Sequence, residues 1–283
     1  MQRVLIINCI EKMKQSLATL ISTIIVAFLF AGPVYAKAYT FGIVPQQSTT
    51  QLVRNWLPVI RKIESHTGLK IKFATAKDIP AFEQHVREGL YDFVYMNPYH
   101  YTVFSETAGY KAIAKQSEKE IKGILVISKD SAIEKISDLN NKEIAFPAPA
   151  AFAATLLVKS YLEEQNVKYA SQYVSSHDAV YRKVAHGQAS VGGGIERTLK
   201  AIDKDIRDKL KIFWTSKGFT PHAFAYHPRV VEEDVAKFLD ALLSLNLPGN
   251  ETLLESIQFE GFEKADDSNW DDVRALNLEN LEK

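Results

Sequence analysis

The side chains best suited to contact a small molecule follow short apolar runs. They lie in five polar, alanine-rich or glycine-rich segments at residues 46–49, 95–101, 147–153, 175–178 and 192–197. Amides, hydroxyls and imidazoles placed there stand beside the first turn of a helix, where free backbone N–H groups attract anions. The chemistry indicated is non-covalent binding of a small solute. We expect eight residues to contact it: Gln47, Ser48, Tyr95, Asn97, Tyr99, Phe152, His177 and Glu196.

Each segment also has a purely structural interpretation. Ser48 and Asn97 are residue types that commonly cap helices. His177 stands at a predicted helix start, where a structural hydrogen bond would explain it nearly as well. Tyr95 and Tyr99 suit the wall of a cleft or ordinary packing. The convergence of five such segments on one cleft favours binding.

Metal, nucleotide and covalent chemistry lack their usual motifs. The seven histidines form no H-x-x-x-H or H-x-H pair with an acid nearby, so we expect no metal and no cofactor. The only cysteine, Cys9, precedes the part expected to be exported, which excludes a thiol nucleophile there. No G-x-S-x-G elbow occurs, and no Gly-Lys-Ser/Thr follows the three glycines at 192–194.

The elements that position these segments alternate between two kinds of run. β-Branched or aromatic runs predict strands, and longer amphipathic runs predict helices. The expected strands are 39–44, 69–74, 91–95, 143–146, 169–174 and 190–193, with extended segments at 211–215 and 223–227. The expected helices are 51–66, 81–88, 150–164, 178–186, 195–202 and 231–244, followed by a polar helical remainder. This alternation is typical of α/β sheets with crossover helices.

The pattern restarts after residue 128, which predicts two lobes. We expect residues 37–127 and 217–283 to form lobe 1 and residues 128–216 to form lobe 2. The crossover segments near 126–129 and 216–223 would act as the hinge. Ligands of such sheets bind beyond the carboxyl ends of the strands, which here would face the cleft between the lobes.

The first 36 residues resemble an export signal. Residues 13–36 hold a short basic start, an apolar run from Leu17 to Phe30, and a small-residue site at Val34-Tyr35-Ala36. The apolar run is shorter than the roughly 20 residues that a membrane-spanning helix needs. We therefore expect cleavage after Ala36 and a periplasmic protein rather than an anchored one. Residues 1–12 look like an added leader.

The charge balance limits the partners. The chain holds 34 basic and 34 acidic residues, a formal net charge of zero. Proteins that bind nucleic acid draw most of their affinity from a basic face, so we expect no nucleic-acid partner. We expect a monomer whose ligand is a small-molecule solute.

Four stretches resemble one known family. They are the segments 41–48, 91–98, 176–180 with 187–189, and 223–228. In order and spacing they are similar to the substrate-binding proteins of phosphate, phosphite and phosphonate ABC transporters. This resemblance covers roughly residues 38–260. It implies a type II periplasmic-binding-protein fold, α/β and two-lobed, with a cleft between two mixed sheets. It also implies a ligand-side role for His177 and, within one or two residues, for Glu196.

The chain departs from that family at one position that matters. The resemblance implies a Ser-Thr-Ser type hydroxyl cluster at the start of a helix in lobe 2, which holds the phosphorus oxyanion. Here residues 150–154 read Ala-Ala-Phe-Ala-Ala. Each lost charge-assisted hydrogen bond is worth about 1.5–3 kcal/mol, so we expect inorganic phosphate to bind poorly. Phe152 either faces the cleft with Tyr95 and Tyr99 or turns into the core of the lobe.

These features predict a binding protein rather than an enzyme. We expect an exported solute-binding protein that captures a small solute, phosphonate- or phosphate-like by resemblance, and delivers it to a membrane ABC permease. One alternative is a ligand-sensing input protein for a membrane signalling partner. Another is a periplasmic enzyme that uses His177 and Glu196 as acid and base.

Overall fold

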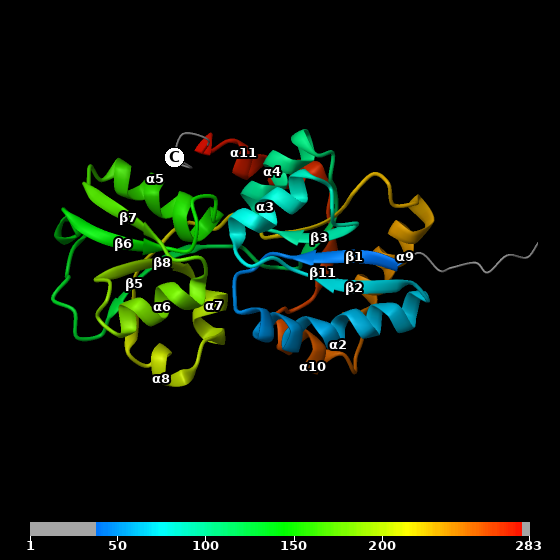
Figure 1. Ribbon diagram of the computed structural model, residues 1–283, viewed down its shortest axis with the longest axis horizontal. Coiled ribbons are helices and arrows are strands. Elements are labelled where there is room, and N and C mark those ends of the chain that lie inside the picture. The colour runs from blue at the N-terminus through cyan, green and yellow to red at the C-terminus, as the bar shows by residue number, and fades with distance from the viewer. Residues whose placement is uncertain (1–37, 279–283) are drawn as a thin grey trace, which may run out of the picture. The chain divides into compact units, whose positions relative to one another are not determined.

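Residues 38–278 are described by the computed structural model, and they form two lobes, each built on one sheet (Figure 1). The first sheet has the strand order β11-β4-β10-β3-β1-β2, and the second has the order β7-β6-β8-β5-β9. Both sheets mix parallel and antiparallel pairs, as the α/β prediction of two mixed sheets required. The predicted export signal lies outside the described residues.

Lobe 1 contains the first sheet. Its strands are β1 (Ala38–Ile43), β2 (Lys70–Ala74), β3 (Phe93–Met96), β4 (Lys111–Gln116), β10 (Ala223–Tyr226) and β11 (Phe262–Lys264). Its helices are α2 (Thr49–Thr67), α3 (Ile79–Arg87), α4 (Pro98–Thr107), α9 (Glu232–Ser244), α10 (Glu251–Ile257), the 3-10 turn η3 (Asp267–Trp270) and α11 (Asp271–Arg274). β1 lies parallel to β2 and β3, while β10 is antiparallel to β3 and β4.

Lobe 2 contains the second sheet. Its strands are β5 (Gly123–Ser128), β6 (Lys142–Phe146), β7 (Tyr169–Tyr173), β8 (Val191–Ile195) and β9 (Leu210–Thr215). Its helical elements are η1 (Ile136–Leu139), η2 (Phe152–Leu156), α5 (Leu157–Glu164), α6 (His177–Ala185), α7 (Glu196–Ala201) and α8 (Lys204–Arg207). β6 is parallel to β7 and β8, while β5 is antiparallel to β8 and β9.

Helix α2 shows how the sequence sets a helix's ends and its buried face. Ser48 Oγ accepts a hydrogen bond from Gln51 N at 3.3 Å, and Gly68 ends the helix in the left-handed region at φ 72°. The buried side chains recur at helical spacing, which turns one face toward the sheet: Leu52, Trp56, Val59, Ile60 and Ile63.

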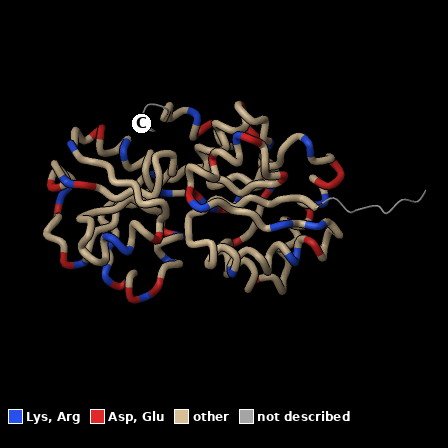
Figure 2. Tube along the Cα trace, viewed as in Figure 1, with Lys and Arg blue, Asp and Glu red and all other residues tan. Residues whose placement is uncertain are grey.

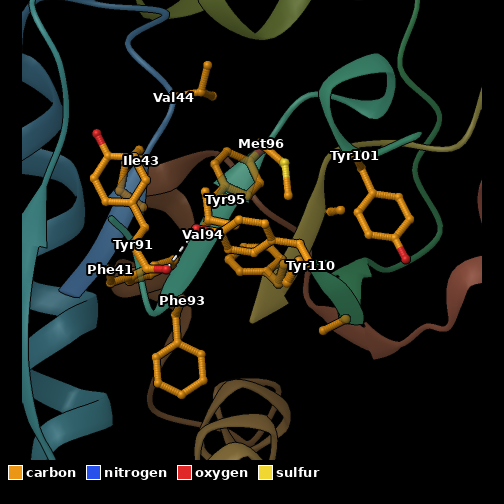
Figure 3. Packing of buried hydrophobic residues seen from close by; sticks show 14 of the residues in the cluster. Phe41, Ile43, Val44, Tyr91, Phe93, Val94, Tyr95, Met96, Tyr101 and Tyr110 are labelled. Carbon is orange, nitrogen blue, oxygen red and sulfur yellow. Dashed lines mark hydrogen bonds between the residues drawn. The ribbon is translucent and has the colours of Figure 1, made fainter. Parts of the chain in front are cut away.

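Aromatic packing around β1 and β3 forms the core of lobe 1 (Figure 3). Phe93 stacks on Phe238 of α9 with ring centroids 4.0 Å apart. Tyr110 lies beside Tyr91 and donates its hydroxyl to the Tyr91 carbonyl at 2.8 Å, so its one polar group is satisfied inside the core.

The first crossover between the lobes lies a few residues before the one expected, whereas the return segment falls within the expected 216–223. β5 pairs with β8 and β9, so the second sheet begins at Gly123 rather than after residue 127. The chain crosses at residues 120–122 and returns at 217–222, where Ile121 and Phe219 form an isolated antiparallel bridge. The strands β4 and β5 follow each other without a helix between them. The alternating pattern therefore did not mark them, and its restart was expected only after residue 128.

Charged residues of both signs alternate along the trace of both lobes (Figure 2). Within residues 38–278, no helix has the length and apolar character needed to cross a membrane. No group of three or more His, Cys, Asp or Glu side chains in that range is arranged to hold a metal ion.

Candidate functional site

The loops at the strand ends of the two lobes contact each other directly. Asn97 Nδ2 donates to the Ala150 carbonyl at 3.0 Å, and His177 N donates to the Gln46 carbonyl at 3.3 Å. The Arg197 guanidinium donates to Gln46 Oε1. Two segments of lobe 1, at 46 and 97, and three of lobe 2, at 150, 177 and 197, therefore meet at one place, and this junction is the candidate site.

The side-chain amide of Asn97 makes one hydrogen bond within lobe 1 and another to lobe 2. Its Oδ1 accepts from His100 N at 2.8 Å and so caps α4, while its Nδ2 makes the bond to Ala150 in lobe 2. The side chain is only 4% exposed. The capping role considered for Asn97 and the site role are thus performed by different atoms of one residue.

Two buried histidines give the junction a neutral polar character. His177 is 2% exposed, and its Nδ1 lies 3.3 Å from Thr198 Oγ1. Burial, together with the nearby Arg197 cation, lowers the pKa of His177 from 6.5 to about 3. Burial and the same cation also lower the pKa of His222 well below its usual value. Both imidazoles are uncharged at neutral pH.

Asp178 adds a buried carboxylate at the junction. Its carboxylate accepts a hydrogen bond from the Ser48 backbone N–H at the start of α2 in lobe 1. Burial raises the pKa of Asp178, although this hydrogen bond acts in the opposite direction. Its Oδ1 has no hydrogen-bond partner.

The helix start in lobe 2 lies between the lobes. η2 is a π-helical turn without a side-chain cap, and the Phe152 ring is 1% exposed and meets Phe219 edge-on at 5.6 Å. Glycines let the sheet approach η2 closely. A Cβ at Gly123 would lie 2.2 Å from the Ala153 carbonyl oxygen, and one at Gly193 would lie 2.0 Å from that of Ala154. The backbone of this helix start is therefore fixed by the strands beneath it.

Two spaces adjoin the junction. A small cavity of about 10 Å³ lies against the helix start and is lined by Asn97, Phe152, His177 and His222 among others. A larger groove of about 730 Å³ runs beside the crossovers. Ile121, Ile195 and His222 line both spaces, so the two are neighbours.

The eight predicted residues are distributed over these features. Asn97, Phe152 and His177 line the small cavity, whereas Tyr95 and Glu196 line the groove. The Ser48 backbone contacts Asp178, while Gln47 and Tyr99 are buried near the junction but line neither space. Glu196 is about half exposed and pairs with Lys200 at 3.2 Å. No contact among residues 38–278 joins Glu196 to His177, so the acid–base pair of the enzyme alternative is not formed in this arrangement.

Three junction residues were not among those predicted. Gln46 and Arg197 each adjoin a predicted residue in a segment that was singled out, and a shift by one residue would have found them. His222 precedes β10 and stacks on Tyr95 with centroids 4.9 Å apart and an interplanar angle of 22°. No motif marks it, because its role depends on a strand that returns from the other lobe.

The sequence of this chain matches one known protein family. The family model described as the periplasmic substrate-binding protein of phosphonate ABC transporters matches residues 41–270. The chain belongs to this family. The family consists of binding proteins, which agrees with the expectation drawn from the four sequence stretches.

Curated relatives are distant in sequence. The Phosphate-import protein PhnD of Mycolicibacterium smegmatis is 21% identical over 269 residues, which cover 86% of this chain and 81% of that protein. The Phosphonates-binding periplasmic protein of Escherichia coli is 23% identical over 263 residues, which cover 86% of this chain and 76% of that protein.

Solved structures share the type II fold. A binding protein of an ABC phosphonate transporter from Pseudomonas aeruginosa superimposes with a TM-score of 0.79 at 19% identity, over 86% of each chain. A methylphosphonate complex from Prochlorococcus marinus gives a TM-score of 0.75 at 16% identity, over 86% of this chain and 99% of that one. At these identities the likeness establishes the fold alone.

Proposed function

We propose that this protein is the exported solute receptor of an ABC transporter for small organic oxyanions of the phosphonate type. The observation that carries the proposal is the family match over residues 41–270, which spans both lobes and the junction. The receptor would be cleaved after Ala36, act as a monomer, and deliver its solute from the periplasm to a membrane permease. The lobes would part and close about the crossovers at 120–122 and 217–222.

The junction supports capture and release rather than catalysis. Its contacts are hydrogen bonds between loops, which lobe opening would break and closure would remake. A ligand shifts such an equilibrium only by binding one arrangement more tightly than the other. The two neutral histidines can donate or accept hydrogen bonds without a charge that would need compensation.

The test combines binding with a conformational readout. Purified protein that begins at Lys37 is titrated with methylphosphonate, 2-aminoethylphosphonate, phosphate and a panel of carboxylates and amines. Calorimetry measures affinity, and small-angle scattering measures the radius of gyration. We expect at least one solute to bind and to change the radius. A panel with no binder and no change in radius would contradict the receptor function.

Export is tested separately. N-terminal sequencing of secreted material should give Lys37 as the first residue. Recovery of the intact 13–36 segment in the membrane fraction would contradict cleavage without affecting the proposed binding.

A further inference from the structure

The large groove is the space at the lobe junction that can hold an organic molecule. The small cavity beside η2 measures about 10 Å³, close to the least volume that admits one water. The Phe152 ring, buried against Phe219, occupies this region, and no hydroxyl side chain stands at residues 150–154. The groove of about 730 Å³ falls within the usual range of small-molecule sites.

Arg197 is the cation of this groove that has no acidic partner. The three groove lysines each pair with a carboxylate: Lys119 with Glu260 at 3.1 Å, Lys122 with Glu120 at 3.3 Å, and Lys200 with Glu196 at 3.2 Å. No carboxylate within residues 38–278 forms an ion pair with Arg197.

The Arg197 guanidinium is held in place by aromatic and amide contacts. It lies 5.7 Å from the ring centroid of Tyr95 and 6.0 Å from that of Phe259, and it donates to Gln46 Oε1. A guanidinium has five N–H donors in a rigid fork, and carboxylates and phosphonates match that fork with two parallel hydrogen bonds. The amide of Gln46 accepts from one of its nitrogens, so donors remain for a ligand.

His222 supplies a second, independent indication of a ligand. Its side chain is 3% exposed, and its Nε2 is buried without a hydrogen-bond partner among residues 38–278. The imidazole is fixed by stacking on Tyr95 and lines both the groove and the small cavity. A buried polar atom without a partner is unfavourable, and a ligand oxygen within reach would relieve this.

We propose that the groove binds an organic oxyanion, a carboxylate or a phosphonate, whose charged group rests on the Arg197 guanidinium with His222 Nε2 beside it. The remainder of the solute lies along the groove, whose other charged side chains are the three lysine–glutamate pairs and the carboxylates of Glu118 and Glu255. The helix start at η2, which the Phe152 ring fills, does not hold the charge. This inference rests on the proposed receptor function and names the chemical class of its solute and the residues that select it.

The experiment compares variants at two positions of α7 with one variant at His222. Arg197→Gln removes both the positive charge and the paired N–H donors of the guanidinium, whereas Arg197→Lys keeps only the charge. Lys200→Gln is the control, because it removes a charge that is already paired with Glu196. His222→Phe keeps a ring for stacking on Tyr95 and removes Nε2. Each variant is titrated by calorimetry with methylphosphonate, 2-aminoethylphosphonate, succinate and benzoate, and with a neutral amide and a simple amine as probes of the other charge classes. Thermal melts verify that each variant folds.

We expect Arg197→Gln to weaken oxyanion binding about 10- to 100-fold, the usual effect of losing a charge-assisted hydrogen bond. Arg197→Lys should fall between this variant and the wild type, and His222→Phe should lose several-fold. Lys200→Gln should stay within about threefold, because its charge is exposed and paired. The phosphonate and carboxylate probes that bind identify the charged group of the solute.

Three outcomes would overturn the inference. Equal losses in Arg197→Gln and Lys200→Gln would indicate unspecific attraction instead of a site. Binding of a neutral or cationic solute, with no oxyanion bound and no effect of Arg197→Gln, would refute the inference and leave the receptor function intact. If no solute of any class binds the wild type, both the inference and the receptor function fail.

Discussion

Acid should destabilise this protein through His177. The pKa of this imidazole is about 3 in the folded protein and 6.5 when it is solvated. Above pH 6.5 it is neutral in both states, and its contribution to stability is complete. As the pH falls below 6.5, His177 binds a proton in the unfolded chain but stays neutral in the folded protein, so the unfolded state is favoured. The loss amounts to roughly 1.4 kcal/mol per pH unit, or about 2 kcal/mol between pH 7 and pH 5.

The pKa of His222 is lowered in the same direction, so the wild type should show a steeper dependence than one histidine gives. The assay is urea unfolding at pH 7, 6 and 5 for the wild type and His177→Gln. His186→Gln is the matched control, because His186 is exposed at the other end of α6. Between pH 7 and pH 5 the free energy of unfolding of the His177 variant should fall by about 2 kcal/mol less than that of the wild type, and the control should follow the wild type.

Two results would contradict the predicted effect of acid on His177. An unchanged slope in His177→Gln would show that the imidazole is not the group that acid acts upon. An NMR titration that places the folded-state pKa of His177 near 6.5 would show that it is solvated. Because the ring lies between the lobes, acid can also separate them, and scattering at pH 5 should then show an increase in radius that the variant lacks.

Three further predictions concern the junction. Phe152→Ser should lower the free energy of unfolding by a few kcal/mol, within the roughly 3–5 kcal/mol of a buried Phe truncation. It should also raise methylphosphonate affinity measured by calorimetry, because it opens the helix start, which the Phe152 ring fills in the wild type, to the charged group. Lost stability with every affinity unchanged would make Phe152 a core residue only. Asp178→Asn should raise the melting temperature at pH 7, because burial raises the pKa of the acid and an amide oxygen still accepts from Ser48 N–H; a lower melting temperature would contradict this. Inorganic phosphate should bind the wild type poorly by calorimetry, and submicromolar affinity would show that backbone N–H groups suffice.

The fold could be predicted because its signals are local. Helix α2, for example, was predicted at 51–66 and spans Thr49–Thr67, with the apolar spacing and the Gly68 stop both visible in the sequence. The family match and the type II neighbours confirm the α/β class and the binding-protein family. β4 and β5 were missed because they follow each other without a helix between them, so the alternation of strand and helix patterns did not mark them.

The junction was less predictable because its contacts join distant segments. The segment containing Gln46 was identified, yet its partner Arg197 lies about 150 positions later in the other lobe. Glu196 was expected in the site from the family resemblance, within one or two residues. The structure pairs that residue with Lys200 and places Arg197 over Tyr95. A one-residue shift at the start of a helix changes which side chain faces the neighbouring lobe, and local pattern does not resolve such a shift.

The close contact of Gly123 and Gly193 with the backbone of η2 affects how the solute specificity of this protein can evolve. Gly123 and Gly193 hold the backbone of the helix start so closely that it cannot be remodelled without loss of the sheet contact. The side chains that project from it are buried, so a substitution there changes packing and chemistry on a constant backbone. A serine replaces phenylalanine, and a serine or threonine replaces alanine, through one base change in a codon. Descendants of this chain can therefore exchange one solute for another through a few point mutations, while the lobes that surround the solute keep their shape.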